Sequence, residues 1–246
     1  MTDLAIIGGT GLTTLETLNI VRREVVHTPY GEVSAPIVHG ELCGKKIAFL
    51  ARHGVGHTIP PHMVNYRANI WALNNIGAKR ILAIAAVGTM KPEYKPGMIA
   101  FPDQIIDYTH SRKQTFFESD LDHVTHIDFT YPYSSGLRKL LIKAAEGANI
   151  EYGGGGTYGA TQGPRLETMA EIKRMQQDGC DIVGMTGMPE ASLARELDMS
   201  YAACVVMANW AAGITQEEIT MEEINRNLDE GMQNVKVLLE HVVEQI

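Results

Sequence analysis

Two stretches of this sequence place polar side chains directly after short apolar runs, where they could bind a small polar ligand. The run Asp181-Ile182-Val183-Gly184 predicts a buried strand, and Met185 and Thr186 follow it just before a helix that begins near Pro189. The stretch from Thr161 to Glu167 predicts a second turn of this kind, which carries a carboxylate ahead of another helix. Backbone N–H groups and the helix dipole point outward at such turns, so they favour ligand binding.

Two further motifs could bind an anion. The turn Gly8-Gly9-Thr10-Gly11 brings backbone amides and one hydroxyl to the end of a predicted strand, Leu4–Ile7. It lacks the Gly-Lys-Ser/Thr of a P-loop and the third glycine and ribose-binding acid of a dinucleotide fingerprint. Arg52 and His53 follow another hydrophobic strand, and a guanidinium offers planar paired donors to phosphate. From these residues alone, a phosphate site and a plain tight turn with a surface arginine both remain open.

Strands and helices alternate along most of the chain, which predicts an α/β fold with a mixed, largely parallel central sheet. The continuous apolar runs at 80–87 and 201–208 indicate strands buried on both faces. The last helix carries an apolar stripe from Ile224 to Val242. We expect one domain, residues 1–246, with helices flanking the sheet. Further strands are expected at 4–7, 98–101, 158–161 and 181–184, a hairpin over 37–50, and helices at 62–75 and 135–147.

The composition argues against several classes of protein. The chain of 246 residues has a net charge of -8 and no basic cluster, so binding to nucleic acid or to a membrane surface is not expected. It contains no apolar run long enough to span a bilayer and no signal-peptide pattern. We therefore expect a cytoplasmic protein.

The cysteine and histidine spacings do not indicate a metal site. Cys43, Cys180 and Cys204 are scattered along the chain and are expected to be reduced thiols. His53 and His57 are four residues apart, but the segment His-Gly-Val-Gly-His has two glycines and no glutamate. A zinc-binding helix is therefore not expected.

Taken together, the strand-end motifs resemble those of the trimeric purine nucleoside phosphorylase and methylthioadenosine phosphorylase family. Each motif is weak by itself, but their joint occurrence in this order is specific, and the resemblance spans essentially the whole chain. It implies the nucleoside phosphorylase fold, a homotrimer, a nucleoside substrate with inorganic phosphate as co-substrate, and no cofactor. The motifs are Gly8-Gly9-Thr10-Gly11, Arg52-His53-Gly54, Val64-Asn65-Tyr66-Arg67-Ala68-Asn69, Val87-Gly88, His126-Ile127-Asp128, Gly163-Pro164-Arg165-x-Glu167-Thr168, Gly184-Met185-Thr186, Pro189-Glu190 and Asn209.

The resemblance implies a phosphate site made from five residues. Its side-chain donors would come from Thr10, Arg52, His53 and Thr186, and Ala86 would contribute a backbone contact.

One departure from the family pattern concerns the same site. Many methylthioadenosine enzymes carry a threonine where this chain has Ala85, so one phosphate donor is missing or is replaced by Thr89 or His62. The resemblance also implies that Met185 packs beneath the ribose and base. His126 would reach into the active site of the neighbouring subunit, so that a trimer is needed for activity.

The residues expected at the base favour a 6-oxopurine. Ionised Glu167 can accept the N1–H of a 6-oxopurine but would face a lone pair on adenine N1, and Asn209 can donate to O6 or N7. The adenine-cleaving relatives typically have serine and two aspartates at these positions, whereas this chain has Ala211 at the third. Such a mismatch can discriminate by roughly 10⁴-fold or more. Glu167 and Asn209 are therefore the predicted catalytic residues, and Glu190 is expected only to interact with its own helix.

The residue expected at the 5′ end of the sugar is Met221, where inosine and guanosine phosphorylases of the family place a histidine. Methionine cannot donate a hydrogen bond, but it packs well against a thioether. Within the resemblance this predicts phosphorolysis of S-methyl-5′-thioinosine to hypoxanthine and 5-methylthioribose 1-phosphate. The alternatives are that Met221 is a core residue and that the protein is a general inosine/guanosine phosphorylase, a methylthioadenosine phosphorylase, a nucleoside-binding regulator without turnover or a dinucleotide-dependent dehydrogenase.

Overall fold

The centre of the molecule is a pair of long parallel strands, β5 (Arg80–Thr89) and β11 (Ser200–Trp210). The computed structural model describes residues 2–12, 17–119 and 121–246. The two strands run side by side along their length, with a β-bulge between Met207 and Asn209. Their residues are buried almost throughout because helices cover both faces of the sheet. The strands predicted at 80–87 and 201–208 are therefore confirmed, and both extend beyond the predicted bounds.

The sheet branches at β5. Its first half pairs with β1 (Leu4–Gly8), its end pairs with β10 (Ile182–Gly184), and β11 lies along its other edge. The path runs β2-β3-β4-β1-β5-β10-β9-β7, with β6 and β8 beyond β11. Parallel pairs outnumber antiparallel pairs among the described strands, which confirms the predicted mixed, largely parallel sheet. The other strands are β2 (Asn19–Glu24), β3 (Ile37–Leu42), β4 (Lys45–Ala51), β6 (Ile99–Ala100), β7 (Gln104–Asp107), β8 (Tyr152–Gly153) and β9 (Thr157–Ala160).

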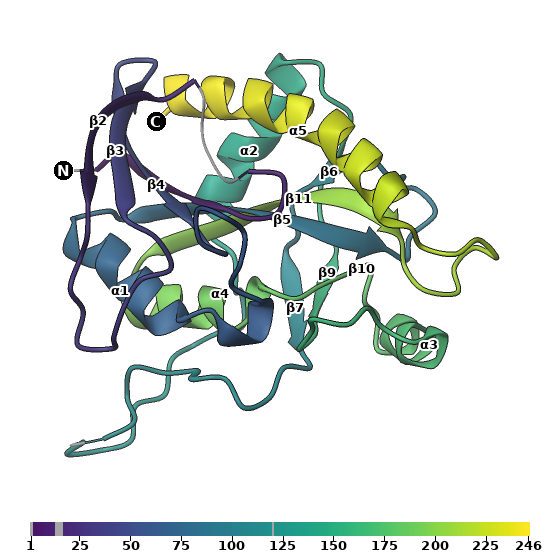
Figure 1. Ribbon diagram of the computed structural model, residues 1–246, viewed down its shortest axis with the longest axis horizontal. Coiled ribbons are helices and arrows are strands. Elements are labelled where there is room, and N and C mark those ends of the chain that lie inside the picture. The colour runs from purple at the N-terminus through teal and green to yellow at the C-terminus, as the bar shows by residue number, and fades with distance from the viewer. Residues whose placement is uncertain (1, 13–16, 120) are drawn as a thin grey trace.

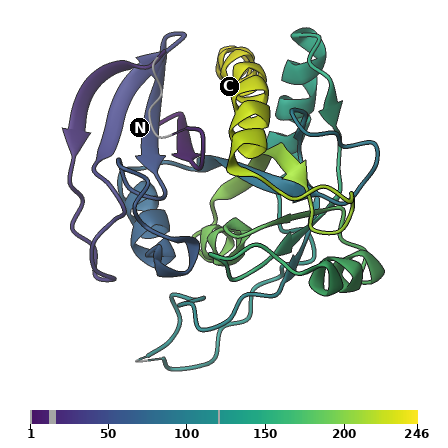
Figure 2. The same ribbon diagram turned by 45° about the vertical axis from the view of Figure 1, so that its right-hand side comes forward.

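Two helix pairs cover the sheet from opposite sides (Figure 1). α2 (Ser135–Gly147) and α5 (Met221–Glu244) pack together on one face, whereas α1 (Tyr66–Asn75) and α4 (Gly187–Glu196) pack together on the other. Figure 2 shows the two pairs well separated by the strands. α3 (Met169–Gln177) lies apart from both pairs, near the end of the sheet that carries β10. The apolar stripe of α5 is buried, as predicted, at Leu228, Met232, Val235, Leu239 and Val242.

The amino-terminal starts of two helices differ from the prediction. The helix expected from residue 62 begins at Tyr66, because Val64 is extended and the Asn65 side chain caps the helix by accepting from the Ala68 N–H. A separate 3₁₀ turn covers Pro61–Met63. In α4, Met188 and Pro189 have non-helical backbone angles, so its regular part begins only at the residue after Pro189.

The segment between β7 and α2 is long and projects from the body of the molecule (Figure 1). The parts of it that the structure describes, residues 108–119 and 121–134, contain neither helix nor strand. His126 lies in this segment and is exposed. Its near end is anchored, however, because Arg112 is buried against the loops that follow β9 and β10. Its far end is anchored too, because Tyr133 is buried and the Ser134 N–H donates to the Tyr201 carbonyl. The segment therefore joins the core at both ends, and only its middle reaches away from it.

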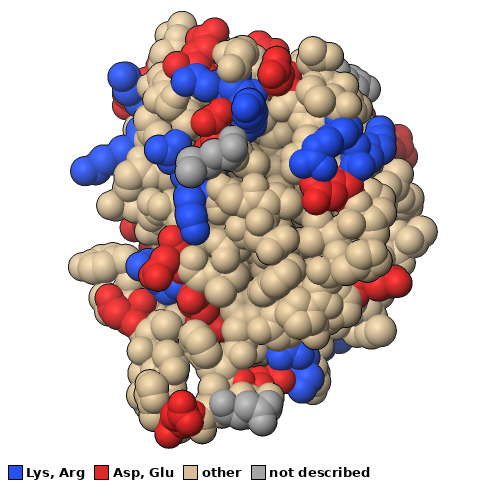
Figure 3. Space-filling view, turned by 90° about the vertical axis from the view of Figure 1, so that its left-hand side faces the viewer, with Lys and Arg blue, Asp and Glu red and all other residues tan. Residues whose placement is uncertain are grey.

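The surface has the mixed charge that the composition predicts. On the face shown in Figure 3, Lys and Arg side chains lie beside Asp and Glu side chains in small groups. Uncharged residues separate one group from the next. None of the described helices is long and apolar enough to cross a membrane.

Candidate active site

A single cavity of ≈ 560 Å³ brings together most of the predicted site residues. Its size is typical of small-molecule sites, which measure roughly 300–1,000 Å³. The cavity therefore unites both ends of the predicted ligand site, phosphate and nucleoside, in one space. The predicted residues that line it are Thr10, Arg52, His53, Ala86, Glu167, Met185, Thr186, Asn209 and Met221.

Residues of the central strands and of the turns that follow them form part of the cavity wall. β1 and β4 are parallel neighbours that end side by side, so Thr10 and Arg52 approach from adjacent strands, and the Arg52 N–H donates to the Gly8 carbonyl over 2.9 Å. Ala86 comes from the middle of β5, and Asn209 follows the bulge in β11. The site is therefore built on the rigid centre of the sheet, which favours precise positioning of its groups.

Arg52 is fully buried in the cavity wall and pairs with a carboxylate on α4. Its Nε donates to Glu190 Oε2 over 2.6 Å, and its Nη2 donates to Glu190 Oε1 over 2.7 Å. Nη1 donates to the Ile84 carbonyl over 3.0 Å. Burial lowers the pKa of Arg52, but the Glu190 charge outweighs it and raises the pKa above the ordinary value. A guanidinium carries five N–H hydrogens, so one on each Nη remains for a ligand.

Glu190 thus has a different role from the one predicted. The sequence places it in the first turn of α4, which suggested an interaction with the helix dipole. In the structure the side chain is 1% exposed and forms a bidentate pair with Arg52. The two partners are 138 positions apart in the sequence, which explains why local pattern could not reveal the pair.

Gly9 makes room for the arginine. A Cβ at this position would lie 2.8 Å from Arg52 Nη1 and 2.5 Å from the Ile84 carbonyl oxygen, which is closer than real Cβ contacts. The glycine turn therefore does more than present amides to an anion, because it also lets Arg52 lie flat against β5.

His53 is held as one neutral tautomer. Its Nδ1 lies 2.8 Å from the Ile59 carbonyl oxygen, and because a carbonyl only accepts, Nδ1 carries the hydrogen. Burial and the neighbouring Arg52 charge lower the pKa of His53 to about 4. Nε2 of the neutral ring is then an acceptor, so His53 can bind a phosphate hydroxyl rather than donate to a phosphate oxygen.

Glu167 is oriented by a neighbouring hydroxyl. Thr161 Oγ1 donates to Glu167 Oε1 over 2.6 Å and lies 3.3 Å from the Gly184 carbonyl at the end of β10. In the described part of the chain no group donates to Oε2. One carboxylate oxygen is therefore fixed by the protein and the other is available to a ligand donor.

Asn209 is 7% exposed and is also held in one orientation. Its Nδ2 donates to the Trp210 carbonyl over 2.7 Å, which leaves one amide hydrogen and the Oδ1 acceptor for other partners. Gly88 lies beside it, since a Cβ there would come within 3.4 Å of Asn209 Nδ2. The absent side chain keeps space open next to the amide.

The cavity lining also includes apolar side chains. Met221 is the first residue of α5 and lines the cavity with Ile219, Ile224 and Ala212. Its side chain is 66% exposed, so it is not a core residue, and that alternative from the sequence is wrong. Met185 also lines the cavity and packs against Gly163, whose φ of 61° and lack of a side chain allow the close approach.

Two predicted residues do not line the cavity. Ala211 leaves the sheet at the end of β11, donates its N–H to the Thr89 carbonyl, and packs in an apolar cluster with Met90 and Val183. Ala212 lines the cavity in its place. His126 lies on the projecting segment and is exposed, so it does not contribute to the cavity of its own chain. Its predicted contact with a neighbouring subunit stays a prediction.

Neither residue suggested as the replacement phosphate donor is at the cavity. The Thr89 hydroxyl is buried and bonded to the Lys91 backbone, and His62 belongs to the 3₁₀ turn outside the lining. His57 and Thr58 do line the cavity, with the two rings of His53 and His57 4.7 Å apart. The turn that follows His53 therefore supplies two polar groups, His57 and Thr58, that the sequence did not assign to the ligand site.

Arg112 was also missed, although it supports the site extensively. It is 9% exposed, and its Nη1 donates to the Met185 and Met188 carbonyls over 2.8 and 2.6 Å. Nη2 donates to the Thr161 and Gln162 carbonyls over 3.1 and 2.8 Å. The one side chain thus ties together the two loops that carry Met185 and Glu167.

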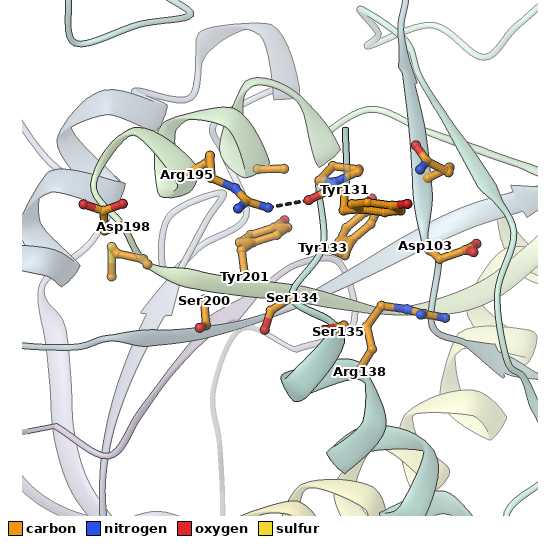
Figure 4. Close-up of a pocket in the computed structure, with 14 residues that line it drawn as sticks. Asp103, Tyr131, Tyr133, Ser134, Ser135, Arg138, Arg195, Asp198, Ser200 and Tyr201 are labelled. Carbon is orange, nitrogen blue, oxygen red and sulfur yellow. Dashed lines mark hydrogen bonds between the residues drawn. The ribbon is translucent and has the colours of Figure 1, made fainter. Parts of the chain in front are cut away.

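A second cavity of ≈ 670 Å³ lies near the start of α2 and contains none of the predicted residues (Figure 4). It is lined by tyrosines, serines and charged groups, including Tyr133, Arg138, Arg195 and Tyr201. We place the candidate active site in the first cavity, because that one combines a buried arginine and other hydrogen-bonding groups with apolar side chains. Among the described residues no group of three or more His, Cys, Asp or Glu side chains is arranged to hold a metal ion.

Comparison with known families gives a match over nearly the whole chain. The sequence profile of the family described as "Phosphorylase superfamily" matches residues 3–244. The chain is 53% identical over 243 residues to a protein of Pseudomonas syringae pv. tomato named probable S-methyl-5′-thioinosine phosphorylase, covering 99% of both chains. It is 48% identical over 229 residues to the 6-oxopurine nucleoside phosphorylase of Pyrococcus furiosus, covering 91% of this chain and 85% of the relative.

The fold also matches a solved structure. The methylthioadenosine phosphorylase from Schistosoma mansoni in complex with adenine superposes with a TM-score of 0.94 at 31% identity, covering 100% of this chain and 92% of that one. The predicted fold class is therefore confirmed.

Proposed function

The chain belongs to the phosphorylase superfamily and is an enzyme of the purine nucleoside phosphorylase type, and we propose that its substrate is S-methyl-5′-thioinosine. The products are hypoxanthine and 5-methylthioribose 1-phosphate. The observation that carries the proposal is that Glu167, Asn209 and Met221 line one cavity together with the predicted phosphate residues.

The base end of the cavity supports a 6-oxopurine. The Thr161 hydroxyl donates a hydrogen bond to Glu167 Oε1, so Oε2 can accept the N1–H of hypoxanthine. The spare amide hydrogen of Asn209 can donate to N7 or O6, since the other hydrogen is bonded to the Trp210 carbonyl. Adenine would set its N1 lone pair against the carboxylate, which costs an unmade buried hydrogen bond. The relatives named for 6-oxopurine and methylthioinosine substrates support the same choice of base.

The sugar end supports a 5′-methylthio group. Met221, Ile219 and Ile224 offer no hydrogen-bond donor to a 5′-hydroxyl, whereas their apolar atoms and the Met221 sulfur pack well against a methylthio group. Ordinary inosine would bury its 5′-hydroxyl against these side chains without a partner. The 66% exposure of Met221 leaves room for a second candidate, a general 6-oxopurine nucleoside phosphorylase, in which solvent satisfies that hydroxyl.

In the proposed reaction a phosphate oxygen forms a bond to C1′ as the C1′–N9 bond breaks and its electron pair moves to the base. The phosphate hydroxyl loses one proton and the departing base gains one, so no cofactor takes part. Arg52 and Thr186 bind the anion. Neutral His53 accepts a hydrogen bond from the phosphate hydroxyl through Nε2. Asn209 stabilises the negative charge that develops on the base.

We further propose that the active form is a homotrimer. His126 projects on a segment that leaves its own cavity, and the exposed Met221 marks a side of the cavity that one chain does not close. A neighbouring copy that contributes His126 would complete that side.

The test is phosphate-dependent release of base from three nucleosides, S-methyl-5′-thioinosine, inosine and S-methyl-5′-thioadenosine, assayed separately at saturating phosphate. We expect the highest kcat/KM with methylthioinosine and the lowest with methylthioadenosine. Equal use of inosine would favour the general 6-oxopurine enzyme, and best use of methylthioadenosine would overturn the assignment of Glu167 and Asn209.

A further inference from the structure

A buried chain of hydrogen bonds connects the phosphate end of the active site with the second cavity. Glu190 Oε1 and Oε2 accept from Arg52, and Tyr201 donates its hydroxyl to Glu190 Oε1 over 2.9 Å. Arg52 lines the active-site cavity, whereas Tyr201 lines the second cavity, where it is labelled in Figure 4. Arg52 and Glu190 are each 1% exposed, and Tyr201 is buried.

We infer that Glu190, itself held by Tyr201, is a positioning residue that sets the plane of the Arg52 guanidinium for phosphate. This inference rests on phosphate binding at Arg52 in the proposed function. A bidentate pair fixes both the position and the rotation of a guanidinium, which a single hydrogen bond does not. Glu190 fixes the edge of the guanidinium that carries Nε and Nη2, and Nη1 donates to the Ile84 carbonyl. The one remaining hydrogen on each Nη therefore points in a defined direction.

The pair also explains how Arg52 can be buried before phosphate arrives. An unpaired guanidinium is costly to bury, and the Glu190 carboxylate removes most of that cost. The Tyr201 hydroxyl gives Oε1 a second donor, so the carboxylate does not have to turn toward other groups. Thus Tyr201 acts on phosphate only through Glu190 and Arg52 and touches no substrate.

Tyr133 provides a matched comparison for Tyr201. Both tyrosines are 3% exposed and line the second cavity, and their rings stack 6.0 Å apart at 24°. They differ in the hydroxyl, because that of Tyr133 is buried without a hydrogen-bond partner in the described part of the chain. Replacing either tyrosine by phenylalanine removes one buried oxygen, but only Tyr201→Phe breaks the chain to Arg52.

The experiment measures phosphate binding directly and then turnover for Tyr201→Phe and Tyr133→Phe. Inorganic phosphate alone is titrated against the melting temperature of each full-length protein, which gives an apparent Kd without any nucleoside. For Tyr201→Phe we expect the Kd and the KM for phosphate to rise about fivefold, which corresponds to the usual net contribution of one hydrogen bond, about 1 kcal/mol. The KM for the nucleoside should not change, and Tyr133→Phe should match the wild type in all three values.

Glu190→Gln extends the series, because it keeps the acceptor oxygen but removes the charge. We expect the phosphate Kd to rise more than in Tyr201→Phe, and Glu190→Asp to recover part of the loss. The inference is overturned if Tyr201→Phe binds phosphate as the wild type does, or if Tyr133→Phe weakens it equally. If the wild type binds phosphate but cleaves none of the three nucleosides, the proposed substrate is wrong while the Kd comparison still decides the role of Tyr201.

Discussion

Arg52 and Arg112 are both buried beside the active-site cavity, yet they support opposite halves of it by different means. Arg52 pairs with the Glu190 carboxylate and keeps two N–H hydrogens for a ligand. Arg112 meets only neutral oxygens, and every one of its five hydrogens has an acceptor within the protein. The comparison teaches that the role open to a buried arginine follows from the donors it has left: Arg52 can still donate to a ligand, whereas Arg112 holds loops.

The largest effect is expected from breaking the Arg52 pair. Arg52→Met should lower kcat/KM for phosphate by about 10³-fold or more, as removal of a group that stabilises an anion does. It should also lower the free energy of unfolding by about 3–5 kcal/mol, because it leaves Glu190 buried and unpaired. Initial rates at varied phosphate and urea denaturation measure the two quantities.

The double variant Arg52→Met/Glu190→Met separates stability from function. Removing both charges should recover most of the lost unfolding free energy, since a buried ion pair and an apolar pair of similar volume are often equally stable. Activity should stay low. Recovered activity would mean that Arg52 does not bind phosphate.

Arg112→Met should affect the nucleoside half instead. The loops that carry Met185 and Glu167 lose their common donor, and a displacement of about 1 Å at a reacting group can cost about 10²-fold in kcat/KM. The phosphate Kd from melting-temperature shifts should rise far less than in Arg52→Met, because Thr186, between Met185 and Met188, is the one predicted phosphate residue on these loops. Arg112→Lys is the control, because it keeps the charge without the planar fork and should behave like the methionine variant. Phosphate binding weakened as much as in Arg52→Met would remove the distinction between the two arginines.

The His53 ring should make the phosphate end sensitive to acid. Its pKa is lowered from 6.5 to about 4, so the unfolded chain binds this proton more readily than the folded one does. The resulting stability is present above pH 6.5 and is lost as the pH falls toward 4. Between pH 7 and pH 5 the loss should be about 2 kcal/mol, and His53→Gln should lack it. Identical pH profiles of unfolding for the two proteins would show that His53 is not held neutral.

The smallest effect is expected at the exposed end of the cavity. Met221→His introduces a donor for a 5′-hydroxyl and should shift the kcat/KM ratio of inosine to methylthioinosine about tenfold toward inosine. Met221→Leu, which stays apolar, should leave the ratio near the wild-type value. An unchanged ratio in the histidine variant would place the 5′ group away from residue 221.

The residues that could be predicted from the sequence are those whose neighbours in the chain define them. Thr10 and Arg52 follow apolar strands and Asn209 lies near the end of one, so the strand pattern already places them at one end of the sheet. Glu167 and Met185 follow shorter strands in the same way. All five line the cavity. β1, β4 and β11 run parallel to β5 and deliver the first three to a common edge, whereas β9 and β10 run in the opposite direction, so parallel strand ends alone do not place Glu167 and Met185 there.

The rest depends on contacts between distant parts of the chain. The acceptors of Arg112 lie 46 to 76 positions away, in a segment with no periodic pattern to mark it. Ala211 was placed at the site by the pattern of the adenine-cleaving relatives, but the strand ends at Trp210 and the next residue turns into another cluster. β2 escaped prediction because five of its six residues are exposed, and an edge strand needs no apolar alternation.

The most direct test of the account is a competition assay in which equimolar S-methyl-5′-thioinosine, inosine and S-methyl-5′-thioadenosine react with limiting enzyme and excess phosphate. The account predicts that the ribose 1-phosphate carrying a 5-methylthio group forms first, with hypoxanthine as the base released. Early release of adenine would contradict the roles of Glu167 and Asn209. Equal early consumption of inosine and methylthioinosine would contradict the role of Met221.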